Sequence, residues 1–201
     1  CAIVLPATGL WVYPAWQLWV GALMVFAIAF IDDRYPIRAR FRLSVQLGAG
    51  LLVTAATGWT LRSLGPILGD FDIQLGWVAL PFTLLGIAAL TNAINMTDGL
   101  DGMAGGVIAS ALFWLAAGFL LIGSDLQTRH AGPLADQALG SARALTVLVG
   151  ATLGFLFFNQ RTPWRKTAAI FLGDGGSMML GFTIAVLCVY IASGFGDAGM
   201  P

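Results

Sequence analysis

The chain has 201 residues, of which 58% are hydrophobic and 10% are charged, and its mean hydropathy is +0.85. A soluble domain usually carries about 25% charged residues, so this composition excludes an ordinary soluble protein and predicts an all-α, polytopic helical membrane protein. The acidic and basic residues cancel, and a net charge of zero gives no basic surface for binding nucleic acid. The two cysteines, Cys1 and Cys188, provide no disulfide framework.

The start of the chain is cysteine, and no charged segment precedes an apolar core as it would in a signal peptide. We therefore expect an internal fragment, incomplete at both ends, of a longer protein. We expect residues 1–201 to form a single membrane-embedded domain.

Apolar stretches long enough to span a membrane, which takes about 20 residues, recur along the chain. We predict about six transmembrane helices, at roughly 15–31, 43–59, 77–93, 103–123, 142–158 and 169–191. The connection at 60–76 contains FDIQL, which alternates apolar and polar residues after Gly69-Asp70, and this pattern predicts a short β-hairpin. The connection at 124–141 is polar and predicts a loop.

The charged residues divide unequally between the two sides of the membrane. The loops after the first and fifth spans hold seven of the ten basic residues, and the positive-inside rule places these loops in the cytoplasm. Five of the ten aspartates fall on the same side, namely Asp32, Asp33, Asp98, Asp101 and Asp174. Carboxylates beside hydrocarbon are costly unless they serve a function, so we expect them to hold a divalent metal and phosphate at the membrane surface.

The pair Asp32-Asp33 closes the first span. Adjacent carboxylates repel each other, so they need a cation or a shared proton. A Mg²⁺ ion would satisfy them, but so would ion pairs with Arg34 and Arg38 at an ordinary solvated helix end. The pair alone does not separate these interpretations.

The segment 92–106, NAINMTDGLDGMAGG, repeats a polar residue every three positions, at Asn92, Asn95, Asp98 and Asp101. Three-residue spacing keeps side chains near one helix face. Amide oxygens and carboxylates suit Mg²⁺ or nucleotide hydroxyls. Helix capping by Asn and Asp is the structural alternative.

The segment 171–181, FLGDGGSMMLG, places Asp174 among glycines before a long apolar stretch. Backbone N–H groups at such a helix start suit phosphate, and Asp174 suits the metal that accompanies it. The glycines alone are also typical of close helix packing in membranes, and the segment does not match a P-loop. Nearby basic residues such as Arg165 and Lys166 suit a phosphate or set the topology, and Asn159 is a candidate nucleotide contact.

Taken in order, FIDDR, NAINMTDGLDGMAGG and FLGDGGSMMLGF resemble the polyprenyl-phosphate N-acetylhexosamine-1-phosphate transferases, a glycosyltransferase family 4 type. The branch most resembled is the bacterial undecaprenyl-phosphate GlcNAc-1-phosphate transferases of surface-polysaccharide synthesis. The resemblance implies an enzyme of the bacterial cytoplasmic (inner) membrane whose active site faces the cytoplasm. It would use Mg²⁺, or Mn²⁺ in its place, to transfer a sugar-1-phosphate from a UDP-sugar, with UDP-GlcNAc favoured, to polyprenyl phosphate, and release UMP. That reaction initiates lipid-linked precursors of the cell wall or of lipopolysaccharide.

The resemblance also assigns roles to individual residues. It implies catalytic roles for Asp32, Asp33, Asp98 and Asp101, and metal binding by Asp174 and Asn95. It also implies nucleotide binding by Asn92, while the residues themselves suggest substrate binding by Asn159, Arg165, Lys166 and Gly175.

Two other classes of protein are alternatives. A transporter with an intramembrane Asp/Asn pathway predicts carboxylates near the middle of the bilayer and internal repeats. A helical scaffold subunit predicts decay in the motifs. A homodimer is left open, because small residues such as Gly48 and Gly154 are compatible with helix packing between copies.

Overall fold

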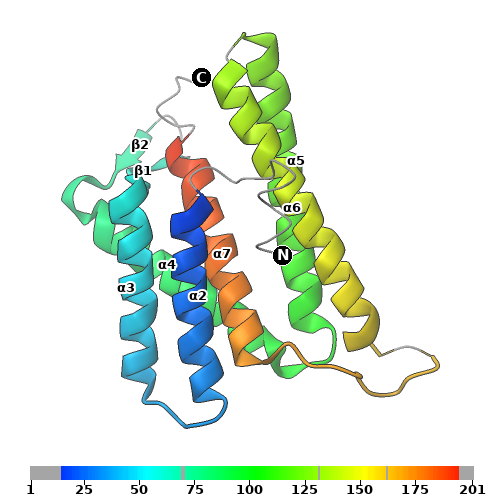
Figure 1. The fold of residues 1–201 in the computed structure, drawn as a ribbon. Coiled ribbons are helices and arrows are strands. Elements are labelled where there is room, and N and C mark those ends of the chain that lie inside the picture. Colours follow the sequence, from blue (N-terminus) through cyan, green and yellow to red (C-terminus); the bar gives the residue numbers. More distant parts are fainter. Residues whose placement is uncertain (1–14, 69–70, 131, 162, 195–201) are drawn as a thin grey trace. The chain divides into compact units, whose positions relative to one another are not determined.

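The computed structural model describes residues 15–68, 71–130, 132–161 and 163–194 and is shown in Figure 1. The described part contains α2 (Ala15–Asp32), α3 (Ala39–Thr57), β1 (Ser63–Leu68), β2 (Phe71–Gln74), η1 (Gly76–Val78), α4 (Ala79–Met96), η2 (Thr97–Gly99), α5 (Met103–Thr128), α6 (Gly132–Asn159) and α7 (Gly173–Gly194).

The helical prediction is confirmed, because each of the six predicted spans coincides with one of the helices α2 to α7. Among the described residues, four helical stretches are both long and apolar enough to cross a membrane, namely Gly76–Gly99, Met103–Thr128, Gly132–Asn159 and Gly173–Ser193. The predicted hairpin is also confirmed, since β1 pairs antiparallel with β2. Its predicted turn residues Gly69 and Asp70 lie outside the described residues. The chain is therefore a polytopic helical membrane protein with one small hairpin.

The prediction of a polar loop over 124–141 is wrong. α5 continues to Thr128 and α6 begins at Gly132, so only a short connection separates the two helices. The segment that follows Gly132 is rich in Ala and Leu and begins with Pro133, a residue suited to the first turn of a helix. Its scattered polar side chains lower the hydropathy but do not interrupt the helix.

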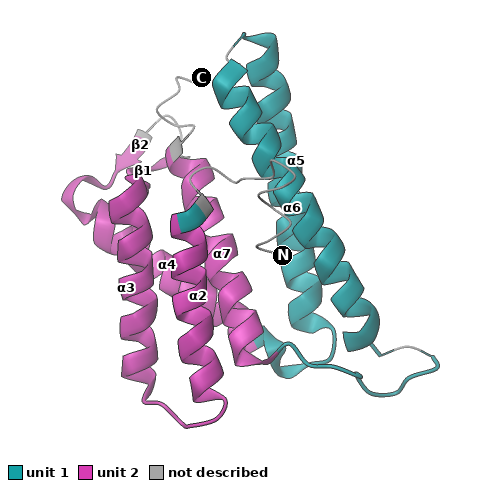
Figure 2. Ribbon diagram, in the orientation of Figure 1, with its two compact units in different colours: residues 1–16, 97–172 teal, residues 17–96, 173–201 magenta. Residues whose placement is uncertain are grey.

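The described chain divides into two compact units, each of which is described by itself (Figure 2). Unit 2 spans 17–96 and 173–201 and contains α2, α3, α4, α7 and the hairpin. Its core is apolar and includes Val25, Val53, Ile87 and Phe182, each at most 1% exposed.

Glycines let the helices of unit 2 approach closely. A Cβ atom added at Gly181 of α7 would lie 3.1 Å from the backbone oxygen of Thr91 in α4. A Cβ atom added at Gly21 of α2 would lie 2.9 Å from the Phe182 ring of α7. Small residues at such contacts are the usual means of packing helices in a membrane.

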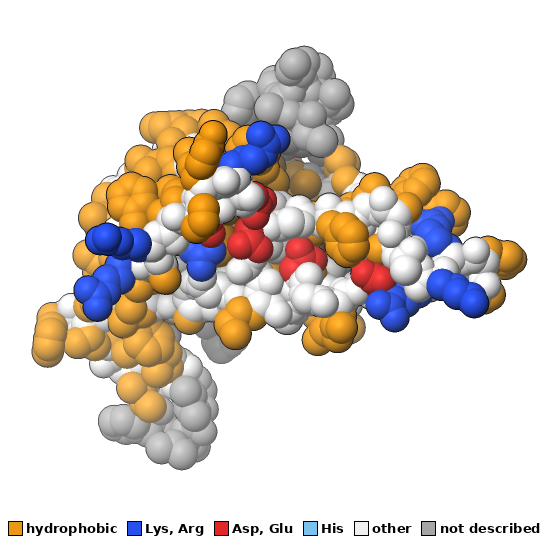
Figure 3. All heavy atoms as spheres, turned by 90° about the horizontal axis from the view of Figure 1, so that it is seen from below, with side chains coloured by type: hydrophobic (Ala, Val, Ile, Leu, Met, Phe, Trp, Pro, Cys, Tyr) orange, Lys and Arg blue, Asp and Glu red, His pale blue; other side chains and the backbone are white. Residues whose placement is uncertain are grey.

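The helix directions in unit 2 bring four helix termini to one end. α2 and α4 run toward this end, while α3 and α7 start from it, and the hairpin lies at the opposite end (Figure 1). Figure 3 looks onto the end where α2 and α4 finish and shows carboxylates at the surface. The polar segments of unit 2 therefore gather although they are far apart in sequence.

Unit 1 contains η2, α5, α6 and the connection up to Leu172, together with the first residues of the chain. α5 and α6 form an antiparallel pair held by glycines. Cβ atoms added at Gly105 and Gly123 would lie 2.7 Å from Leu156 and 2.8 Å from Leu139, respectively. Large apolar side chains such as Trp114 and Leu121 are each 72% exposed, as expected of surfaces that face lipid.

Candidate active site

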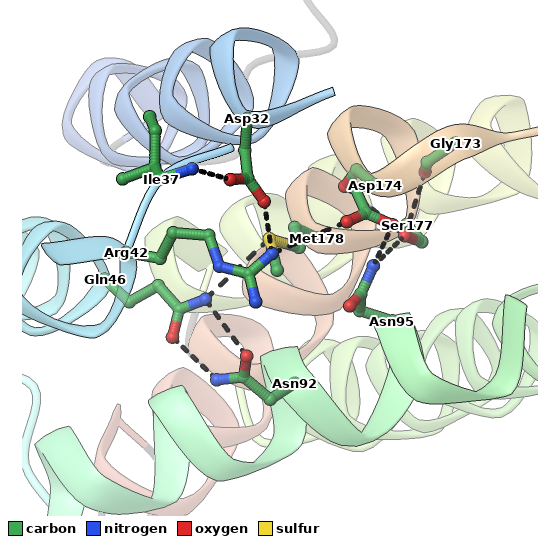
Figure 4. Close-up of polar contacts among 10 residues, drawn as sticks. All are labelled: Asp32, Ile37, Arg42, Gln46, Asn92, Asn95, Gly173, Asp174, Ser177 and Met178. Carbon is green, nitrogen blue, oxygen red and sulfur yellow. Dashed lines mark hydrogen bonds and ion pairs between the residues drawn. The ribbon is translucent and has the colours of Figure 1, made fainter. Parts of the chain in front are cut away.

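A single cationic nitrogen connects two carboxylates from different helices of unit 2 (Figure 4). Arg42 Nη1 of α3 donates to Asp32 Oδ2 of α2 at 2.5 Å and lies 3.5 Å from Asp174 Oδ2 of α7. Asp32 ends its helix, where the helix dipole disfavours a negative charge, and the guanidinium compensates for this. Asp174 lies in the first turn of α7, where the dipole favours it.

The second oxygen of each carboxylate is held by another group. Asp32 Oδ1 accepts a hydrogen bond from the Ile37 backbone N–H at 2.6 Å. Asp174 Oδ1 accepts one from Asn95 Nδ2 of α4 at 3.0 Å. The Asn95 amide also donates to Ser177 Oγ at 2.9 Å, and this hydroxyl donates to the Gly173 carbonyl oxygen at 2.9 Å. Both carboxylates are therefore fixed in orientation, with their Oδ2 atoms directed at Arg42.

Asp33 and Gly175 occupy different surroundings near the start of α7. The Asp33 side chain is exposed, and its Oδ2 lies 3.6 Å from where a Cβ atom on Gly173 would be. Gly175 is buried, and a Cβ atom there would lie 3.3 Å from the Phe26 ring of α2. Gly175 therefore brings α7 close to α2, while Asp33 lies beside the first turn of α7.

A reciprocal amide pair lies one helical turn from Arg42. Asn92 Nδ2 of α4 donates to Gln46 Oε1 of α3 at 2.7 Å, and Gln46 Nε2 donates back to Asn92 Oδ1 at 3.4 Å. Gln46 is 1% exposed and its Nε2 also lies 3.8 Å from Met178 Sδ. The Asn92 amide donates further to the Ala88 carbonyl oxygen at 2.7 Å. In this conformation Asn92 connects α3 with α4.

Unit 1 has its own polar cluster around Asp101, just before α5. Arg161 Nε donates to Asp101 Oδ2 at 2.7 Å, and the Ala168 backbone N–H donates to the same oxygen at 3.3 Å. The hydrogen bond from Arg161 holds the pKa of the Asp101 carboxyl below its ordinary value. Asp101 therefore connects the start of α5 to both ends of the segment 161–168.

Asn159, the last residue of α6, joins the same elements. Its Oδ1 accepts a hydrogen bond from the Gly102 backbone N–H at 2.9 Å, and its Nδ2 donates to the Ile170 carbonyl oxygen at 2.7 Å. Gly102 has φ of 80°, a conformation suited to glycine. Asn159 is 3% exposed, so in this conformation it fixes the chain between α6 and α7.

The basic residues of that connection differ in their contacts. Arg165 Nη1 donates to the Phe158 carbonyl oxygen at 2.8 Å, and its guanidinium lies 5.8 Å from the centre of the Phe158 ring. Lys166 is exposed. Asp98 lies half-buried in η2, also within unit 1.

The structure thus brings some of the predicted site residues together. Asp32, Asn95 and Asp174 share one network of hydrogen bonds and ion pairs in unit 2. Asn92 lies on the same helix as Asn95, and Asp33 directly follows α2. Asp98, Asp101, Asn159, Arg165 and Lys166 belong to unit 1.

Three residues that make these polar contacts in unit 2 were not predicted as site residues, namely Arg42, Gln46 and Ser177. Arg42 was one of seven basic residues on its side, and nothing in the sequence distinguished it. Gln46 carried a usable signal, because a lone glutamine within an apolar helix needs a partner.

The donor atoms of unit 2 fit a divalent metal. Mg²⁺ prefers oxygen ligands, and in proteins it is bound by one or two carboxylates that are completed by waters and substrate phosphates. Asp32 and Asp174 direct two carboxylate oxygens at one cationic nitrogen, so these oxygens already accommodate a positive charge between them. Within the described ranges, no group of three or more acidic, His or Cys side chains is arranged to hold a metal ion.

In a comparison with known protein families, residues 15–192 of the chain match glycosyl transferase family 4. One relative is a probable undecaprenyl-phosphate N-acetylglucosaminyl 1-phosphate transferase of Bacillus subtilis (strain 168), 36% identical over 84% of the chain and 41% of the relative. Another is a phospho-N-acetylmuramoyl-pentapeptide-transferase of Chlorobium phaeobacteroides (strain BS1), 30% identical over 88% of the chain and 51% of the relative. The corresponding transferase of Desulforapulum autotrophicum is 34% identical over 85% of the chain and 50% of the relative. The chain thus spans about half the length of these relatives or less.

Proposed function

Because the chain belongs to glycosyl transferase family 4, we propose that the protein transfers a sugar-1-phosphate from a UDP-sugar to polyprenyl phosphate in the bacterial cytoplasmic membrane. The observation that carries the proposal is the convergence of Asp32 and Asp174 on one cationic nitrogen at the polar end of apolar helices. A site that balances charge at the end of membrane spans suits a reaction between a charged nucleotide sugar and a lipid phosphate.

In this reaction a phosphate oxygen of the polyprenyl phosphate attacks the phosphorus atom that bears the sugar. The bond from that phosphorus to the bridging oxygen breaks, and UMP leaves with this oxygen. The products are polyprenyl-diphospho-sugar and UMP. Phosphoryl transfer requires positioning and charge neutralisation more than covalent participation by the protein. The lipid phosphate is already ionised near neutral pH, so the reaction does not require a strong base.

We assign the metal to Asp174, Asn95 and Asp32. In unit 2 Asn95 contacts Asp174 directly, and Arg42 joins Asp174 to Asp32. Mg²⁺ bound there would neutralise charge on the diphosphate of the sugar donor. The exposed Asp33 carboxylate would orient the lipid phosphate through a shared proton or through the same cation. We assign nucleotide or phosphate binding to the polar residues of unit 1, namely Asp98, Asp101, Asn159, Arg165 and Lys166.

We propose that this polar end faces the cytoplasm, where UDP-sugars are made, and the support is the gathering of basic residues in the segments on this side. For the sugar we propose GlcNAc. The support is the 36% identity to the relative named for N-acetylglucosamine, compared with 30% and 34% for the two named for muramoyl-pentapeptide.

The transporter alternative predicts carboxylates near the middle of the spans. The candidate carboxylates instead lie at helix ends, because Asp32 closes α2 and Asp174 lies in the first turn of α7. The position of these carboxylates at helix ends and the family membership therefore both favour the transferase.

The test is a membrane assay of the full-length protein with undecaprenyl phosphate, Mg²⁺ and a UDP-sugar labelled in the sugar. UDP-GlcNAc and UDP-MurNAc-pentapeptide are compared in parallel. We expect label from UDP-GlcNAc to enter the lipid phase, with release of UMP, and the transfer to stop when EDTA removes the metal. Transfer from UDP-MurNAc-pentapeptide alone would correct the sugar, and the absence of transfer from every UDP-sugar would contradict the proposed reaction.

A further inference from the structure

We propose that Arg42 is a built-in cation that occupies the carboxylate pair in the metal-free protein, and that a divalent metal binds by displacing it. The proposal rests on the metal site of the proposed function and adds a competitor to that site. It assigns Arg42 as a positioning residue that sets how tightly the metal is held.

The contacts show which oxygens are in competition. Asp32 Oδ1 accepts the Ile37 backbone N–H and Asp174 Oδ1 accepts the Asn95 amide. The Oδ2 atoms of the same two carboxylates both face Arg42 Nη1, at 2.5 Å and 3.5 Å. A metal that joins the two carboxylates would use these Oδ2 atoms, since the Oδ1 atoms already have partners. The guanidinium and the metal therefore require the same two oxygens.

The two cations cannot share the position. Mg²⁺ lies about 2.0–2.1 Å from its oxygen ligands, so an arginine nitrogen left in place would lie within contact distance of a second positive charge. Arginine does not lose its proton in proteins, so Arg42 can relieve this repulsion only by moving. Its side chain is 26% exposed and Asp174 is 41% exposed, so the guanidinium can swing toward solvent without crossing the core.

The arrangement also gives Asp32 a compensating charge that does not depend on metal. Asp32 is only 12% exposed and lies at the unfavourable end of a helix dipole, so it requires a compensating charge. Arg42 supplies that charge from α3 in the absence of metal. The consequence is weaker metal binding, because the metal must replace an ion pair rather than fill a free site.

The experiment is a titration of the purified full-length protein with Mn²⁺, in which electron paramagnetic resonance measures the free ion. The key variant is Arg42→Gln. Its matched control is Arg40→Gln, which removes the same charge from the same turn of α3, and the Arg40 backbone oxygen accepts a hydrogen bond from Ser44 Oγ at 2.9 Å. We expect Arg42→Gln to tighten Mn²⁺ binding about tenfold, and Arg40→Gln to change it less than about twofold, because close charges dominate and distant ones are screened.

A second variant keeps the proposal testable where Arg42→Gln does not yield folded protein. Arg42→Lys retains the charge, so Mn²⁺ affinity should stay within about threefold of the wild type. Equal affinities in folded wild type and Arg42→Gln would overturn the competition while leaving the metal site intact. An Arg42→Lys affinity raised as far as that expected for Arg42→Gln would also overturn it. Mn²⁺ binding that is absent in the wild type and in Arg42→Gln, or unaffected by Asp174→Asn, would overturn the metal site itself.

Discussion

Asn95 on α4 donates a hydrogen bond of 3.0 Å to Asp174 on α7, across 79 positions of sequence. The same amide binds Ser177, one helical turn further along α7. Asn95 thus sets both the position of the carboxylate and the register between two helices whose backbones approach closely at Gly181. A metal bound as proposed would therefore be coupled to helix packing in this part of unit 2, and mutations there require measurements of folding as well as of activity.

Replacing Asp174 with Asn should abolish metal-dependent transfer while preserving the fold. The amide keeps an oxygen that can accept from Asn95, but it removes the charge that would neutralise the metal. Removing one electrostatic group of this kind typically lowers turnover by about 10²–10³-fold. The measurement is sugar transfer by membranes that contain equal amounts of full-length wild type and variant, with thermal stability recorded in detergent.

The matched control for Asp174→Asn is Asp136→Asn. Asp136 is exposed in the first turns of α6, whereas the candidate residue Asn159 ends that helix. We expect transfer within about twofold of the wild type, because isolated surface substitutions seldom exceed ±0.5 kcal/mol. Wild-type transfer by Asp174→Asn would contradict the metal role, and strong loss in Asp136→Asn would contradict the membrane topology.

The amide pair of Gln46 and Asn92 can be tested by a double-mutant cycle. Gln46→Leu leaves Asn92 Oδ1 without its partner, and Asn92→Leu removes the donor to Oε1 of Gln46, a residue that is 1% exposed. Each single variant should lose about 1–2 kcal/mol of stability, because a buried polar group without a partner is costly. The double variant should recover part of this loss, since two apolar side chains replace both members of the pair. Additive losses in thermal unfolding of the purified protein would contradict the coupling.

The fold was largely predictable from the sequence because membrane spans depend on composition over long windows. Helix ends were harder, as α6 shows. Its first turns are polar enough to resemble a loop but consist of good helix formers. Hydropathy measures transfer into lipid and does not detect a helix that continues past the membrane.

The candidate site was predictable as a set of residue types but not as a set of contacts. Asp32, Asn95 and Asp174 stand out because charged and amide side chains are rare in apolar segments. The partner that joins two of them, Arg42, is one basic residue among several in its loop, and only packing of α3 against α2 and α7 selects it. Pairings between distant helices depend on rotation and register, which no local pattern encodes.

The hydrogen bonds that Asp101 accepts from Arg161 and from the Ala168 backbone should be insensitive to pH over the physiological range. Its pKa is lowered by the hydrogen bond from Arg161, so the ionised form is stabilised in the folded protein. The stabilisation is therefore fully present above the ordinary aspartate pKa of about 3.9 and is lost only as pH falls through the lowered folded pKa. The Ala168 amide, which donates to the same carboxylate, reports this contact. The hydrogen-exchange rate of the Ala168 amide, corrected for the intrinsic rate, should be constant from about pH 5 to 8. Faster corrected exchange at one end of that range would contradict the lowered pKa of Asp101.

Close packing of α4 on α7 should be required for the geometry of the site. Gly181→Ala places a Cβ atom 3.1 Å from the Thr91 backbone oxygen, which cannot move as a side chain would, so the helices must separate. Overpacking of this kind typically costs about 1–3 kcal/mol, and separation would lengthen the contact between Asn95 and Asp174 on the same two helices. The matched control is Gly86→Ala in α4, where nothing lies within 4 Å and alanine favours the helix by up to about 1 kcal/mol. We expect Gly181→Ala to lower the melting temperature and the Mn²⁺ affinity together, and Gly86→Ala to lower neither. Equal effects of the two substitutions would mean that the approach of α4 to α7 does not position the carboxylate.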